Sequence, residues 1–231
     1  YRLDVLVDEP DVSPLGVQGP KADDVMADVF GDAVRDIRFF RFAMLEFQGR
    51  KLAVARSGYS KQGGFEIYLR DGTKGTQLWN IFKEAGQPWG IGPGAPATCE
   101  RTESGLLSLG GDTDGNTNPF EVRLESYLDL DVPDDVIGIH ALRKIKAEGP
   151  KRHQLGLVLE GETPAPLRFA WEDIELDGVK VGKMTNAAWS YRMKKNIGYA
   201  LISREAQIGQ EVVIKRQTGD TAATLVELPF L

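Results

Sequence analysis

The stretch that most constrains the fold is residues 56–69, which read RSGYSKQGGFEIYL. Its glycines separate an apolar run, residues 52–55, from an alternating run, residues 65–69. Short β-type runs joined by a glycine-rich segment predict two strands with a turn between them. Successive side chains of a strand point to opposite faces, so Glu66 and Tyr68 share the face opposite the apolar residues. Such a pair can form one wall of a ligand pocket; the alternative is an ordinary hairpin whose polar face meets water.

Apolar periodicity in the first part of the chain predicts an antiparallel sheet with helices packed on it. Strands are expected at residues 1–7, in a short run from 12, and at residues 38–47, 51–57 and 65–69. Helices are expected at residues 20–30, 76–85 and 134–147. Gly31 and Gly86 stand where the first two helices should end. His140 is expected on the third helix as a partly exposed neutral side chain rather than a catalyst.

The predicted elements change from helices to short strands after Gly149 and Pro150. These two residues end the third helix and mark a domain boundary. Short strands are expected beyond it, at residues 155–159, 168–169, 174–176, 179–181, 197–202 and 211–215. Asp177-Gly178 is typical of a two-residue hairpin turn. The predicted fold class is therefore α+β. Residues 1–149 form an antiparallel sheet with packed helices, and residues 150–231 form a small β-barrel.

Composition excludes several classes of protein. The 28 basic and 34 acidic residues give a net charge of −6, and no basic run stands out, which argues against a nucleic-acid partner. No apolar run approaches the length that spans a membrane. The single cysteine, Cys99, cannot form an internal disulfide and favours a reducing compartment, so a cytoplasmic location is expected. With one cysteine and two histidines, no metal site is expected.

Two patterns that look like ligand sites fail on spacing. Residues 87–96 contain alternating glycines, but a dinucleotide loop needs G-x-G-x-x-G between a strand and a helix, and prolines interrupt this stretch. Asp112, Asp114 and Asn116 alternate as in a calcium loop. The sixth and twelfth positions of such a loop must be glycine and glutamate, and here they are neither.

Residues 56–66 resemble the Arg-Thr-Gly-Tyr-Thr-Gly-Glu-x-Gly-Phe-Glu signature of the folate-dependent aminomethyltransferase family, which includes the T-protein of the glycine cleavage system. Further matches follow the family order: Gln-Gly-Pro-Lys at 18–21, Arg-x-Glu-x-Gly at 101–105, Asn-Pro-x-Glu at 118–121 and Gly-Pro-Lys-Arg at 149–152. The resemblance covers essentially the whole chain. It is closest to the dimethylsulfoniopropionate demethylase branch, although Arg123 replaces a glycine usual there.

The resemblance implies a tetrahydrofolate-dependent methyltransferase of the aminomethyltransferase fold, with a folate-binding domain and a C-terminal barrel. Its substrate would be a small methylated donor, with a dimethylsulfoniopropionate-like sulfonium favoured. A sulfonium methyl is already activated, so in-line positioning and a dry site suffice, and aromatic faces attract the cation. The alternatives are a methoxy-aromatic O-demethylase, a glycine-cleavage-type aminomethyltransferase, a non-enzymatic folate-binding module, and a structural domain that binds nothing.

The resemblance also implies three cofactor-binding residues. Glu66 falls on the family's pterin-binding glutamate, and a carboxylate suits the amide-like donors of a pterin ring. Tyr68 falls on an aromatic residue that lies near folate and substrate in the demethylase branch, and Tyr59 on a position that is Trp or Tyr in the family. Ala97 falls where the glycine-cleavage branch has a folate-contacting arginine, which favours a demethylase-like member.

One departure concerns catalysis. Full-length family members carry a long segment before the part that matches Tyr1, and that segment supplies the catalytic or orienting aspartate. We therefore expect the catalytic residue outside this chain, in an N-terminal segment or a partner chain, and little turnover by the chain alone. Arg101 is expected in a structural salt bridge, with Glu103 or Glu121, rather than at the ligand.

Overall fold

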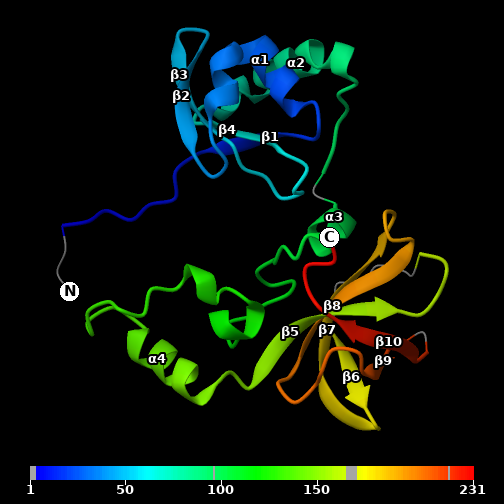
Figure 1. Cartoon of the computed structure of the whole chain (residues 1–231). Coiled ribbons are helices and arrows are strands. Elements are labelled where there is room, and N and C mark those ends of the chain that lie inside the picture. The colour runs from blue at the N-terminus through cyan, green and yellow to red at the C-terminus, as the bar shows by residue number, and fades with distance from the viewer. Residues whose placement is uncertain (1–3, 96, 165–170, 218) are drawn as a thin grey trace. The chain divides into compact units, whose positions relative to one another are not determined.

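The structure is a computed structural model that describes residues 4–95, 97–164, 171–217 and 219–231 (Figure 1). The chain divides into two compact units, Tyr1–Pro96 and Ala97–Leu231. The domain boundary predicted after residue 149 stays a prediction. The division of the chain by spatial contacts is a different one and falls at Pro96.

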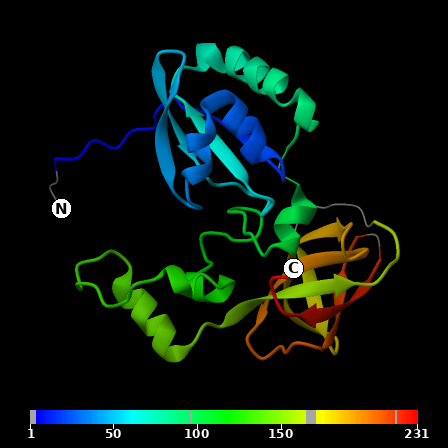
Figure 2. The same cartoon turned by 45° about the horizontal axis from the view of Figure 1, so that its top comes forward.

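The first unit contains a four-stranded antiparallel sheet with the strand order β1-β4-β3-β2. Its strands are β1 (Ser13–Gln18), β2 (Phe42–Phe47), β3 (Arg50–Ala55) and β4 (Gly64–Leu69). The helices α1 (Ala22–Phe30) and α2 (Gly75–Ala85) lie on one side of this sheet (Figure 2). Short 3-10 helices at Asp32–Asp36, Gly72–Lys74 and Gln87–Trp89 connect these elements. The predicted antiparallel sheet with packed helices is confirmed.

The core of this unit lies between the sheet and the two helices. Alternate residues of the strands enter it together with one face of each helix: Val17, Leu52, Val54, Phe65 and Ile67 from the sheet, and Val25, Met26, Leu78 and Phe82 from the helices. Burying each such side chain is worth about 1.5–3 kcal/mol, so the sheet register is fixed by which face is apolar. The opposite face of β4 is thereby left to Glu66 and Tyr68.

Two expectations for this unit were wrong in extent. Residues 4–7 have no regular structure, and Val5, Leu6 and Val7 are 65–89% exposed, because their alternation meets no partner strand. The strand expected at 38–47 begins only at Phe42. Before it the chain turns, with Phe40 in the left-handed region at φ 57°. Gly31 ends α1 at φ 83°, as predicted.

The second unit ends in a closed six-stranded barrel with the strand order β10-β5-β8-β7-β6-β9. Its strands are β5 (Arg152–Leu159), β6 (Glu172–Leu176), β7 (Val179–Ser190), β8 (Lys195–Ser203), β9 (Glu211–Lys215) and β10 (Thr221–Val226). The predicted small barrel is confirmed, with Asp177-Gly178 joining β6 to β7. Strand β7 is far longer than expected and β10 was missed, while the strand expected at 168–169 lies outside the described residues.

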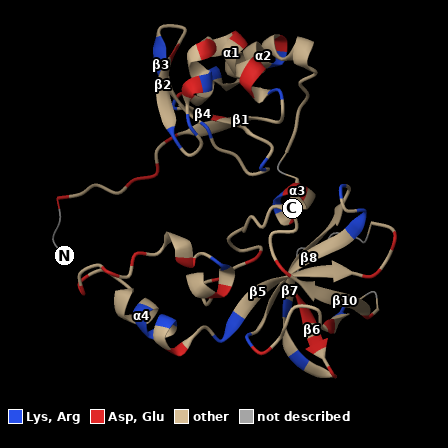
Figure 3. Cartoon of the chain, in the orientation of Figure 1, with Lys and Arg blue, Asp and Glu red and all other residues tan. Residues whose placement is uncertain are grey.

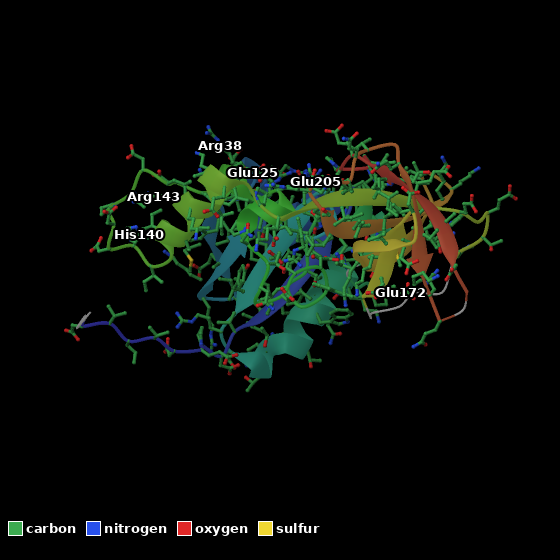
Figure 4. All side chains as sticks on the ribbon, turned by 90° about the horizontal axis from the view of Figure 1, so that it is seen from below. Arg38, Glu125, His140, Arg143, Glu172 and Glu205 are labelled. Carbon is green, nitrogen blue, oxygen red and sulfur yellow. The ribbon has the colours of Figure 1, made fainter. Side chains whose placement is uncertain are left out.

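The segment before the barrel carries α3 (Thr98–Glu103), 3-10 helices at Pro119–Val122 and Glu125–Tyr127, and α4 (Ile139–Glu148). Helix α4 begins later than the predicted residue 134, because Gly138 takes a left-handed conformation at φ 84° just before it. His140 is exposed on α4, where its side chain lies at the periphery (Figure 4).

Both acidic and basic residues occur along the barrel strands (Figure 3). Asp173 on β6 lies 2.6 Å from Lys180 and 3.8 Å from Lys183. None of the described helices has the length and apolar character needed to cross a bilayer. The expectation of no nucleic-acid partner stays a prediction.

His153 on β5 is expected to make the stability of the second unit, which contains the barrel, depend on pH. Its Nε2 atom is sealed from solvent without a hydrogen-bond partner among the described residues, and burial lowers the pKa of His153. Since the unfolded chain binds the proton more readily, stability is complete above the ordinary histidine pKa of about 6.5 and is lost as pH falls towards the folded pKa.

We expect the urea midpoint of the barrel unit to fall between pH 7.5 and pH 5.5. The His153→Asn variant, which keeps a donor near the Nδ1 position but cannot titrate, should lose this part of the pH dependence. His140→Asn is the matched control on an exposed histidine. Equal pH slopes for wild type and His153→Asn would contradict the assignment.

Candidate functional site

The open face of the first unit's sheet presents Glu66 and Tyr68 from β4, an inner strand paired with β1 and β3. The residues that pair with these two on the neighbouring strands are all small: Gly16 and Ala55 beside Glu66, and Pro14 and Ala53 beside Tyr68. No bulky neighbour on those strands therefore overhangs either polar side chain.

The edge strand β2 continues the same two rows with Phe42, opposite Ala55, and Met44, opposite Ala53. Phe42 is 67% exposed and Met44 is 51% exposed. Because neighbouring strands lie about 4.8 Å apart, the two alanines form a flat strip about 10 Å wide between the side chains of β4 and those of β2. A planar ring system can lie on this strip with one edge towards Glu66.

The carboxylate of Glu66 is held at one of its two oxygens. The Ser57 hydroxyl donates a short hydrogen bond to Oε2, and the Tyr68 hydroxyl lies 3.5 Å from the same atom. Among the described residues, no hydrogen bond reaches the other oxygen, Oε1. An ionised carboxylate accepts at both oxygens, so Glu66 keeps acceptor capacity for a ligand.

Tyr68 stays a protonated phenol at neutral pH. Its burial, followed by the charge and hydrogen bond of Glu66, raises the pKa of Tyr68, while a hydrogen bond with Ser57 acts in the opposite direction. Tyr68 can therefore donate a hydrogen bond and offer its aromatic face to the open side of the sheet.

The structure brings Glu66 and Tyr68 together and adds Ser57, which the sequence interpretation did not assign. Tyr59 is half-buried in the same turn, two residues after Ser57. Whether Tyr59 acts with the other two stays a prediction. Spacing could not have indicated Ser57, because its contact with Glu66 depends on the path of the turn between β3 and β4.

Arg56, the first residue of the signature, is structural. Its Nη2 donates to both carboxylate oxygens of Asp23 on α1, at 2.9 and 2.7 Å. Its guanidinium lies over the Phe65 ring, 4.9 Å from the centroid. These contacts tie the end of β3 to α1 and to the start of β4.

Arg101 also forms a structural salt bridge, but its expected partners were wrong. Its Nη1 lies 2.6 Å from Oδ2 of Asp112, whose side chain is completely buried. Asp112 accepts three further hydrogen bonds: from the Ser108 backbone N–H at 2.8 Å, Asn186 Nδ2 at 2.7 Å and Thr185 Oγ1 at 3.3 Å. This carboxylate fastens α3 and its following loop to β7.

The two glutamates that were expected to bind Arg101 have other partners. Glu103 accepts from the Ser190 hydroxyl at 2.6 Å and lies 3.5 Å from Arg192. Glu121 receives two hydrogen bonds from Arg152, at 2.9 and 2.8 Å. These pairs fix the segment before the barrel to β5 and to the end of β7.

The alternating acidic residues of the 112–116 stretch do not converge. Asp112 is buried and accepts hydrogen bonds from β7. Asp114 is exposed and accepts instead from the Asn116 backbone N–H at 2.9 Å and from the Thr117 hydroxyl at 2.8 Å. Across the described part of the chain, no three His, Cys, Asp or Glu side chains gather in a way that could hold a metal ion.

Two family models match the chain. The GCVT N-terminal domain matches residues 4–132, and the glycine cleavage T-protein C-terminal barrel domain matches residues 152–231. The chain is 47% identical over 202 residues to the dimethylsulfoniopropionate demethylase DmdA of Ruegeria pomeroyi, covering 87% of this chain and 54% of that protein. It is 34% identical over 233 residues to an aminomethyltransferase of Clostridium botulinum, covering 97% of this chain and 61% of the relative.

A solved structure supports the same fold. The glycine cleavage system aminomethyltransferase T from Bartonella henselae superposes with a TM-score of 0.74 at 22% identity, covering 95% of this chain and 60% of that one. The chain thus spans between about half and three-fifths of the length of these relatives.

Proposed function

Since the chain belongs to the glycine cleavage T-protein family of aminomethyltransferases, we propose that it takes part in tetrahydrofolate-dependent methyl transfer from a small methylated donor. Tetrahydrofolate, when bound, supplies the nitrogen that accepts the one-carbon unit. The 47% identity to a protein named dimethylsulfoniopropionate demethylase favours a sulfonium donor of that kind. The aminomethyltransferase relatives, at 31–34% identity, favour a glycine-cleavage-type reaction as the second candidate.

The single observation that carries the proposal is the Glu66 carboxylate on the open sheet face, held at Oε2 and open at Oε1. A reduced pterin presents an edge of N–H donors, and a carboxylate accepts from such an edge. The strip over Ala53 and Ala55 offers a flat surface for the ring, and Tyr68 stands at its border. These residues fit a folate cofactor.

A sulfonium donor needs little from the protein beyond placement. The leaving thioether is neutral, so a general base is not required, and an aromatic face attracts the positive charge of the sulfonium donor while it is bound. Tyr68 and Tyr59 are the proposed aromatic neighbours. The proposal assigns this chain cofactor-binding residues and no catalytic residue. A cytoplasmic location stays a prediction.

Tetrahydrofolate at about 100 times its dissociation constant is expected to stabilise the wild-type chain by about 2.7 kcal/mol, seen as a raised thermal midpoint under anaerobic conditions. The Glu66→Gln variant should lose this shift, because the neutral amide turns a donor towards the donors of the pterin. Glu46→Gln makes the same change at an exposed position of β2 on the same sheet face and should keep it.

Equal shifts in the wild type and in Glu66→Gln would contradict the assignment of the site. No shift in the wild type would contradict folate binding by this chain. The donor is identified separately, by following formation of methylated folate with dimethylsulfoniopropionate, a methoxybenzoate and an aminomethyl donor in parallel. Methylated folate is expected to form slowly, from dimethylsulfoniopropionate and from neither of the other two donors.

A further inference from the structure

The turn that carries Ser57 is fastened to β1 by one side chain. Gln18, the last residue of β1, donates from Nε2 to the Ser57 carbonyl at 2.9 Å and to the Phe65 carbonyl at 3.1 Å. The two acceptors flank the whole turn, and the second belongs to the residue immediately before Glu66. A single amide group therefore fixes both ends of the turn.

Ser57 passes this constraint on to Glu66. Its carbonyl is held by Gln18, and its hydroxyl donates to Glu66 Oε2. The Tyr68 hydroxyl approaches the same oxygen, at 3.5 Å. The three contacts together define which oxygen of Glu66 faces the protein and which faces the open side of the sheet.

Gly58 is part of the same arrangement. Its φ lies outside the left-handed region, so its backbone does not require glycine. A Cβ at this position would clash with Oε1 of Gln18 and would lie 2.7 Å from its Nε2. The Gln18 amide therefore occupies the space that a side chain at position 58 would need. An alanine there would push the flexible end of Gln18 away from its two acceptors while leaving the side chains of Ser57 and Glu66 chemically unchanged.

We propose that Gln18 and Ser57 are positioning residues that aim the Glu66 carboxylate at its ligand, with Gln18 acting through Ser57 and Ser57 acting through Glu66. This inference rests on the proposed function for the identity of the ligand, tetrahydrofolate. The clamp, defined as Gln18, Ser57 and the space at Gly58, contributes affinity by preparing the carboxylate before the ligand arrives.

The test measures the dissociation constant of tetrahydrofolate for matched variants. Ser57→Ala should weaken binding about tenfold, which corresponds to about 1.4 kcal/mol, because one oxygen of Glu66 loses its donor. Ser57→Thr, which keeps the hydroxyl, should bind within about twofold of the wild type. Unliganded thermal midpoints check that each variant is folded.

A second set of variants tests the role of Gln18. Gln18→Ala and Gly58→Ala should each weaken binding several-fold, and the double variant should bind no more weakly than Gln18→Ala alone. The reason is that the added Cβ has nothing left to displace once the Gln18 amide is gone. A purely structural effect of Gly58→Ala would persist in the double variant. Additive losses, or wild-type affinity in Ser57→Ala, would overturn the inference.

The ligand-free protein separates this inference from the proposed function. If the wild type fails to bind tetrahydrofolate, the proposed function is overturned, and the clamp is then judged by urea midpoints of Ser57→Ala, Glu66→Gln and their double variant. Shifts that do not add support a coupled Ser57–Glu66 pair. Additive shifts overturn the positioning role as well.

Discussion

Replacing Asp112 by alanine is expected to destabilise the barrel unit by about 3–5 kcal/mol, because it leaves the Arg101 guanidinium in a largely buried site without its partner. The change also removes the acceptor of three other donors: the Ser108 N–H, Asn186 and Thr185. Each buried donor left unsatisfied adds its own desolvation cost. Urea unfolding followed by far-ultraviolet circular dichroism measures the loss.

Asp114→Ala is the matched control for this prediction. Asp114 lies two residues away and is exposed, so its replacement should change stability by no more than about 0.5 kcal/mol. The double variant Arg101→Met/Asp112→Leu should cost less than the sum of the two single changes, since no charge is left uncompensated. A loss below about 1 kcal/mol in Asp112→Ala would contradict the assigned role of this ion pair.

Replacing Gly64 by alanine is expected to destabilise the first unit by about 2–5 kcal/mol, from backbone strain of about 1–3 kcal/mol and a steric clash of similar size. Gly64 has φ 145°, which residues with a side chain rarely adopt. A Cβ there would lie 2.5 Å from the Val17 carbonyl oxygen and 2.8 Å from the Gln18 Cα. Because these are backbone atoms of β1, the pairing of β1 with β4 must open.

Gly63→Ala separates strain from the clash. Gly63 also has a positive φ, of 83°, but a Cβ there would meet nothing within 4 Å. Its replacement should cost about 1 kcal/mol, the penalty for an alanine in the left-handed region. Tetrahydrofolate binding should be lost with Gly64→Ala and retained with Gly63→Ala. Equal stability losses for the two variants would show that the approach of β1 to β4 does not govern this position.

Local periodicity was enough to predict much of the first unit. The alternation of Phe65, Ile67 and Leu69 placed Glu66 and Tyr68 on a common face, because a strand's two-residue period is set by its own backbone. The strand expected at residues 1–7 is absent over residues 4–7 for the complementary reason, since alternation without a partner strand does not form a sheet; residues 1–3 lie outside the described part of the chain. Strand β10 was missed because its residues, TAATLV, are small and weakly alternating.

Contacts that depend on the path of a loop could not be predicted from spacing. Arg101 was correctly expected in a salt bridge, but its partner could not be predicted. The loop after α3 places Asp112 beside Arg101, and Asp112 is held there by residues of β7 that lie 73 or more positions later in the sequence. Ser57 was missed in the same way. The family resemblance supplied the candidate residues Glu66, Tyr68 and Tyr59, but not the hydrogen bonds that orient them.

The two units differ in whether their sheets have open edge strands. Closure of the barrel gives every one of its strands two neighbours, whereas the sheet of the first unit has β1 and β2 with one partner each. An open strand edge is a template for pairing with another molecule. Of the two edge strands, β2 is the more open to pairing with another molecule, because Phe42 and Met44 are exposed on it; the charge of Glu46 opposes such pairing. Strand β1 is less open, because Pro14 has no backbone N–H to donate. The edge of β2 is therefore where this sheet offers unpaired backbone groups beside exposed apolar side chains, and we expect added charge on that strand to make this edge less prone to pair.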